Sequence, residues 1–127
     1  MRIYLAARYH RLEELRSYAD DLRALGHQVT ARWIERRQKA PGPLDHPSWA
    51  DIAQQDVDDI LQADAVITFA EPHRVEEGGG RHAEFGMGLA WGKRLVVVGR
   101  AEHLFHTLPS VEVYPTWRDA LRGLAAG

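Results

Sequence analysis

The stretch AVITFAEPHRVEEGGGRHAEFGMGLAWGKRLVVVG, residues 65 to 99, places two apolar runs on either side of a glycine-led helical pattern. The runs at 65–70 and 94–99 are short and mainly apolar, which favours two buried strands. The glycines at 78–80 form a loop, and a helix follows from about Gly80 or Arg81. Two such strands joined through a helix are typical of a parallel sheet that is covered on both faces.

The rest of the chain continues this alternation of strands and helices. We expect, in chain order, a strand at 2–7, a helix at 10–25 ended by Gly26, a strand at 28–33, a loop at 35–47, a helix at 48–62 with Ser48 as its N-cap, a weaker strand at 111–114 and a last helix capped by Thr116. This order predicts a single α/β domain over residues 1–127. Its five-stranded, mainly parallel sheet lies between two layers of helices.

The composition excludes several classes of function. The chain has 127 residues and a net charge of −2, which lacks the basic excess expected of a protein that binds nucleic acid polymers. It has no cysteine, so disulfides and thiolate zinc sites are excluded. No apolar run is long enough for a signal peptide or a membrane span, so we expect a cytoplasmic protein without membrane association.

The topology indicates where a ligand binds. In open α/β sheets, ligands lie beyond the carboxyl ends of the strands, at the point where the strand order reverses. We therefore expect the segments 7–9, 71–84 and 100–106 to gather at one edge of the sheet. The proline-rich loop at 35–47 is long enough to form a lid over such a site.

Glu84 is the first candidate catalytic residue. It lies near the start of the predicted helix, where unpaired N–H groups and the helix dipole favour an ionised carboxylate, as a carboxylate nucleophile requires. The alternative is a first-turn acid that only stabilises the helix. Gly86 and Gly88 each cost about 1 kcal/mol relative to alanine in a helix. Gly88 lies one turn beyond Glu84, which suggests room for a bound molecule there.

Asp56 is the second candidate. Ile52 and Ile60 lie four residues to either side of it, so this carboxylate interrupts an apolar helical face. A buried acid without a partner titrates with a raised pKa and can act as an acid/base group opposite an ionised carboxylate. The alternative is that the apolar face is centred elsewhere and leaves Asp56 at a solvated edge.

Several further residues are candidates for substrate contacts. Backbone N–H groups of Gly78, Gly79 and Gly80 can cradle a phosphate ahead of a helix. Arg8 and Arg81 are candidates for anion contacts, and the helix-end residue His82 for a substrate hydroxyl. Each of these also has a plain structural explanation, as a surface charge or a helix-end side chain. Trp33 and Trp49 flank the 35–47 loop and either stack on a flat ring or pack in the core.

The pair His103 and His106 suggests a metal ion. No obvious carboxylate completes a ligand set around this pair, and the segment is typical of a loop. We therefore predict neither a metal site nor a cofactor.

Three stretches together resemble the nucleoside 2-deoxyribosyltransferase family and its deoxynucleoside monophosphate N-glycosidase relatives. They are the opening IYLAA, the run DVDDILQAD with Asp56 eight residues before Asp64, and GGGRHAEFGMGLAWGK with Glu84. The last matches the family's Gly-x-x-x-Glu-x-Gly helix that ends in Gly-Lys. The resemblance is strongest over the middle third of the chain.

The resemblance implies a flavodoxin-like sheet and attack of Glu84 on C1′ of a 2-deoxyribosyl group. It also implies that Asp56 places or protonates the departing base and that Tyr4, like the matching family tyrosine, lies near the sugar or the nucleophile. Ala7 belongs to the matching opening stretch and is expected beside the substrate. Gly78 stands where the transferases carry a sugar-binding aspartate, six residues before the nucleophile.

The resemblance also bears on partners and leaves alternatives open. Family members commonly complete their sites with a neighbouring subunit, so a homodimer or larger assembly is expected. A rival function is a non-catalytic module that senses a nucleotide in the same cleft. A third is a phosphoribohydrolase of the cytokinin-activating type, whose signature proline and threonine are missing here.

Overall fold

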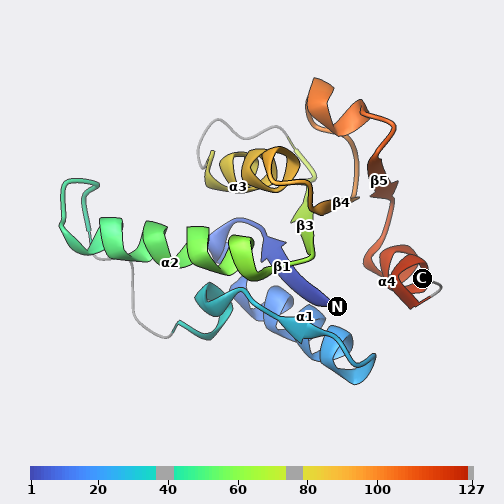
Figure 1. Ribbon diagram of the computed structural model, residues 1–127, viewed down its shortest axis with the longest axis horizontal. Helices are drawn as coiled ribbons and strands as arrows, with labels where there is room; N and C mark the ends of the chain where they lie inside the picture. The colour runs from blue at the N-terminus through green and yellow to red at the C-terminus, as the bar shows by residue number, and fades with distance from the viewer. Residues whose placement is uncertain (37–41, 74–78, 126–127) are drawn as a thin grey trace.

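The computed structural model describes residues 1–36, 42–73 and 79–125 (Figure 1). Its strands are β1 (Arg2–Ala6), β2 (Gln28–Val29), β3 (Ala65–Phe69), β4 (Arg94–Val98) and β5 (Val111–Tyr114). Its α-helices are α1 (Leu12–Ala24), α2 (Ser48–Gln62), α3 (Gly80–Ala90) and α4 (Trp117–Ala125). Three short 3₁₀ turns, η1 (Tyr9–Arg11), η2 (Arg32–Glu35) and η3 (Leu104–Thr107), lie between them.

The five strands form one parallel sheet in the order β2-β1-β3-β4-β5. Ile3 of β1 pairs with Val29 on one side and with Ala65 on the other, so the strand order reverses around β1. Every residue of β3 is buried, as its unbroken apolar run predicts. This is the strand order of flavodoxin-like folds, and the predicted fold class is confirmed.

Helices cover both faces of the sheet (Figure 1). On one face α1 and α4 lie side by side, because Trp117 Nε1 donates a hydrogen bond of 2.9 Å to Asp21 and the Trp117 ring stacks on Tyr18. On the other face α2 and α3 pack against each other and against β1. Within the described part of the chain, no helix combines the length and the apolar character needed to cross a membrane.

The second strand is shorter than predicted. The sequence indicated a strand over residues 28–33, but β2 ends at Val29 and residues 32–35 form η2. Two contacts hold this turn. Trp33 Nε1 donates to the carbonyl of Leu5 at 2.8 Å, and the buried Asp59 carboxylate accepts from Arg32 at both its backbone N–H and its Nε. These contacts with β1 and α2 outweigh the local strand preference of the segment.

Some of the predicted helix caps are present in the structure and one is not. The second long helix begins at Ser48 as expected, but Pro47 is its N-cap residue and no side chain caps it. Thr116 caps the last helix as predicted, because the Asp119 N–H donates to Thr116 Oγ1 at 3.1 Å. Gly26 ends the first helix in the left-handed region, with φ at 89°.

Gly88 serves helix packing, and the prediction that it clears space for a ligand is wrong. It is buried under α3, where a Cβ atom would lie 2.9 Å from Val66 Cγ2 and 3.1 Å from Leu95 Cδ2. The missing side chain therefore lets α3 approach β3 and β4 closely. A Cβ at the exposed Gly86 would meet no atom within 4 Å.

These two glycines give a matched pair of alanine substitutions. Gly86→Ala should stabilise the protein by about 1 kcal/mol, because alanine favours a helix and finds open space there. Gly88→Ala should destabilise it by about 1–3 kcal/mol, the usual cost of overpacking a tight core site. Urea unfolding of both variants tests this. Equal effects in the same direction would contradict the assigned helix–sheet contact.

Candidate active site

A cavity of about 480 Å³ lies where the strand order reverses, beside the segments that follow β1 and β3. Its lining residues are Ala7, Arg8, Tyr9, Trp33, Arg36, Leu44, Trp49, Ile52, Asp56, Gly80, Arg81 and Glu84. They come from η1, η2, α2, the segment before α2, and the start of α3. For the described residues, the predicted gathering of segments 7–9, 71–84 and 100–106 is confirmed. Arg8 lies 3.6 Å from Glu71, Arg100 donates to the carbonyl of Glu71, and Arg81 pairs with Glu102.

The cavity brings together most of the residues singled out from the sequence. Glu84, Asp56, Ala7, Arg8, Gly80 and Arg81 all line it. Gly79 is the N-cap residue of α3. Gly78 lies outside the described residues.

Glu84 is held at the cavity by a residue of the central sheet. Tyr4, fully buried in β1, donates a hydrogen bond from its hydroxyl to the Glu84 carboxylate. The same arrangement raises the pKa of Tyr4, chiefly through burial and then through the Glu84 charge. The tyrosine therefore stays a proton donor and fixes the orientation of the carboxyl group.

The expected ionisation of Glu84 is wrong for the ligand-free protein. Burial raises the pKa of Glu84 from 4.5 to about 8, against the lowering effect of the Tyr4 hydrogen bond. The predicted first-turn position is also wrong, because α3 has no acidic residue in its first turn. Even in the first turn a helix dipole contributes typically about 0.3–1 kcal/mol, which is less than one pKa unit. Desolvation is the larger effect, so the carboxyl group is mainly protonated at neutral pH.

Asp56 faces the cavity from α2, next to Ile52. Its side chain is 25% exposed, yet Oδ1 is buried without a hydrogen bond, and Arg36 Nη2 lies 3.8 Å from it. Burial raises the pKa of Asp56 to about 6, and Arg36 opposes that shift. The alternative that left Asp56 at a solvated edge therefore does not describe the structure.

The two carboxyl groups interact across the cavity. The charge of Asp56 contributes to the raised pKa of Glu84. Asp56 loses its proton at a lower pH than Glu84, while Glu84 is still uncharged. The charge of Glu84 therefore does not contribute to the raised pKa of Asp56. Between about pH 6 and pH 8 the pair therefore holds one proton.

Arg81 and Arg8 both line the cavity but differ in their capacity to donate hydrogen bonds to an anion. The guanidinium of Arg81 is buried and bound to Glu102, with a further bond to the carbonyl of Phe69. Arg8 lies 3.6 Å from Glu71, too far for a hydrogen bond, and its side chain is 29% exposed. Arg8 is therefore better placed than Arg81 to donate hydrogen bonds to a ligand.

Several residues that line the cavity are apolar or aromatic. Trp33 packs at 6.3 Å from Tyr9, and Trp49 donates through Nε1 to the carbonyl of Gly42 at 2.9 Å. Leu44, 86% exposed, also lines the cavity. The sequence drew attention to both tryptophans but not to Arg36 or Leu44, which stand in a charged, proline-rich segment without a distinguishing pattern. Residues 37–41 of the predicted lid lie outside the described residues.

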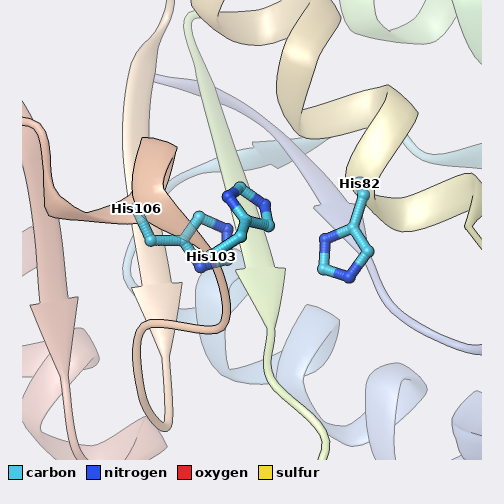
Figure 2. Close-up of side chains that lie close together, drawn as sticks. All are labelled: His82, His103 and His106. Atoms are coloured by element: carbon cyan, nitrogen blue, oxygen red, sulfur yellow. The ribbon is translucent and has the colours of Figure 1, made fainter. Parts of the chain in front are cut away.

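His82 does not line the cavity. Its ring lies 4.9 Å from that of His103, on the side of α3 that faces the segment around η3 (Figure 2). The substrate contact predicted for His82 therefore has no support in this geometry.

Comparison with known proteins identifies the family. The model of the nucleoside 2-deoxyribosyltransferase family matches residues 3–113. No curated protein matches the sequence. Among solved structures, a 2-deoxyribosyltransferase from Bacillus psychrosaccharolyticus aligns with a TM-score of 0.74 at 21% identity, over 95% of this chain and 90% of the other.

Two further structures share the fold. A CMP N-glycosidase from Clostridium botulinum aligns over the full length of both chains, with a TM-score of 0.62 and 22% identity. A conserved protein from Enterococcus faecalis V583 aligns over 96% of this chain and 95% of the other, with a TM-score of 0.68 and 12% identity. With its family match over most of its length, the chain belongs to the nucleoside 2-deoxyribosyltransferase family and is an enzyme that transfers glycosyl groups.

Proposed function

We propose that the enzyme cleaves the N-glycosidic bond of a 2′-deoxynucleoside or its 5′-monophosphate through a covalent glycosyl intermediate on Glu84. The observation that carries this proposal is the meeting of Glu84 and Asp56 in one cavity, with Tyr4 bonded to the Glu84 carboxylate. Two carboxyl groups of different pKa are what a retaining glycosyl transfer requires.

The first step breaks the bond to the base. A Glu84 carboxylate oxygen attacks C1′, and the electrons of the C1′–N bond move to the base. Asp56, in its protonated form, gives its proton to the leaving base. The hydrogen bond from Tyr4 keeps the Glu84 carboxylate oriented during the attack, in which the carboxylate becomes an uncharged ester.

The second step releases the enzyme. Water, or a second base, attacks C1′ of the glycosyl ester, and the ionised Asp56 accepts the proton of this nucleophile. The C1′–O bond to Glu84 breaks and returns the carboxylate. Hydrolysis and transfer to another base share this step and differ only in the group that attacks.

The reaction needs one proton on the carboxyl pair. In the free enzyme that proton resides mainly on Glu84, whereas the first step needs it on Asp56. Both arrangements have the same total charge, so their ratio does not vary with pH. The fraction of reactive enzyme therefore follows the singly protonated pair.

A 5′-phosphate is supported by the cationic end of the cavity. Arg8 lines the cavity, as does Gly80 at the N-terminus of the eleven-residue helix α3. Helix N-termini and guanidinium groups both favour phosphate oxygens. Trp33, Trp49 and Ile52 also line the cavity, and their apolar and aromatic surfaces suit a flat base.

We also propose that the enzyme is a homodimer or a larger homo-oligomer. The support is a group of exposed apolar side chains next to the edge strand β5. Leu104 is 71% exposed, Phe105 51% and Val113 42%. Exposed apolar patches of this kind commonly mark protein contacts.

The nucleophile is tested by Glu84→Gln, which keeps the size of the side chain and an acceptor for Tyr4. Release of free base should fall by at least about 10³-fold, because an amide cannot form the glycosyl ester. Chromatography of reactions with a panel of deoxynucleosides and monophosphates, with and without acceptor base, measures this. Unchanged base release by the folded variant would overturn the assignment.

The same variant tests the raised pKa of Glu84 through stability. Ionising Glu84 in the folded protein is unfavourable, so wild type loses stability as pH rises from about 4.5 through about 8. Glu84→Gln lacks this loss and should be the more stable protein at pH 8.5, by about a few kcal/mol at most. The advantage should vanish near pH 4.5. Urea unfolding at both pH values is the measurement, and a difference independent of pH would contradict the burial effect.

The carboxyl pair predicts a bell-shaped dependence of kcat/KM on pH, with limbs near pH 6 and pH 8. Asp56→Asn should lower kcat/KM by about 10²–10⁴-fold, the usual contribution of a general acid or base, and remove the limb near pH 6. Asp58→Asn, at an exposed position of the same helix, is the matched control and should keep both limbs. An unaltered acidic limb in Asp56→Asn would exclude Asp56 from the proton transfer.

A further inference from the structure

Three histidine rings converge outside the cavity, between α3 and the segment that contains η3 (Figure 2). His82 comes from α3, His103 precedes η3, and His106 lies in it. The ring centroids of His103 and His106 are 3.8 Å apart, and that of His82 lies 4.9 Å from His103 and 6.1 Å from His106. One ring nitrogen from each lies within 4.8 Å of the other two.

Each ring buries a nitrogen without a hydrogen-bond partner. These atoms are Nδ1 of His82, Nδ1 of His103 and Nε2 of His106, and the His106 side chain is only 1% exposed. A buried polar atom without a partner is unfavourable, and three from one cluster indicate a missing shared partner. None of the three histidines lines the cavity that holds Glu84.

We propose that His82, His103 and His106 bind one divalent transition-metal ion of the Zn²⁺ class. Neutral imidazole nitrogens are preferred ligands for Zn²⁺, Cu²⁺ and Ni²⁺, and three of them with an open fourth position for water form a common tetrahedral set. The site does not rest on the proposed function, because it lies apart from the carboxyl pair.

The sequence argued against this site because it offered only two histidines and no carboxylate. The third ligand comes from α3, which the fold brings against the η3 segment. Zn–N bonds of about 2.0–2.1 Å place tetrahedral ligand atoms about 3.4 Å apart. The rings therefore move together by at most about 1.5 Å on binding, within reach of side-chain rotation.

The protonation of the rings has a specific consequence. The backbone N–H of Glu102 donates to His106 Nδ1 at 3.0 Å, so the neutral ring carries its proton on Nε2. Metal binding at Nε2 moves this proton to Nδ1 and displaces the Glu102 N–H. The charge of the nearby Arg81 guanidinium is balanced by its ion pair with the Glu102 carboxylate.

A bound ion would join two elements that position the active site. His82 lies two residues before Glu84, at the start of α3, and the η3 segment follows β4. The ion would therefore hold the first turn of α3 against the sheet edge. Its role would be structural, since it touches no residue of the carboxyl pair.

The site is tested with full-length protein that carries no histidine tag and has been stripped with EDTA. Titration with ZnCl₂ at pH 7.5 in a calorimeter should give saturable binding of one ion per chain. CoCl₂ should give the visible absorption bands of a tetrahedral Co²⁺ complex. The amide resonance of Glu102 should shift when Zn²⁺ is added.

Variants decide whether these histidines are the ligands. His82→Gln and His103→Gln, both at partly exposed positions, should each weaken Zn²⁺ binding at least tenfold. His73→Gln, at an exposed position, is the matched control and should bind like wild type. Circular dichroism verifies the fold of each protein. Absence of saturable 1:1 binding by wild type would overturn the proposal, as would wild-type affinity in both folded ligand variants. Glu84→Gln should bind Zn²⁺ normally, which separates this test from that of the proposed reaction.

Discussion

Desolvation of the Glu84 carboxyl group is the physical constraint that sets the protonation and reactivity of the site. The group lies beyond the first turn of α3, where the helix dipole contributes little, and burial raises its pKa to about 8. Only the hydroxyl of Tyr4 reaches it as a hydrogen-bond donor within the described residues. When Glu84 ionises, its carboxylate is therefore poorly solvated. Such a charge is a stronger nucleophile than one surrounded by water, and formation of an ester would relieve the cost of keeping it buried.

The fold supplies this environment through its strand order. Because the chain places β2 on one side of β1 and β3 on the other, the segments after β1 and β3 separate around a cleft. Tyr4 approaches Glu84 from the floor of this cleft, and α2 brings Asp56 to its wall. The buried pair of Arg81 and Glu102 ties the start of α3 to the segment after β4. Gly88 then allows α3 to lie close to the sheet, which sets the depth at which Glu84 is buried.

Features encoded in local patterns could be predicted from the sequence. The apolar runs of β3 and β4 and the start of α3 near Gly80 follow from spacing within short segments. Spacing alone left alternatives open for Glu84 and Asp56, and the family resemblance favoured their position in the cavity. Features that depend on distant segments could not. A small residue such as Gly88 signals a close approach, but not whether a ligand or the sheet fills the space. The protonation of Glu84 depends on burial by other elements, and the partners of His82 come from the η3 segment.

The central claim is that the sugar becomes bonded to Glu84 during turnover. Acid quenching of the enzyme with a deoxynucleotide substrate, followed by proteolysis and mass spectrometry of the peptides, tests it most directly. We expect one additional glycosyl group on the peptide that contains Glu84, and none in Glu84→Gln. Substrate turnover with the adduct on another residue, or an adduct that persists in Glu84→Gln, would contradict it.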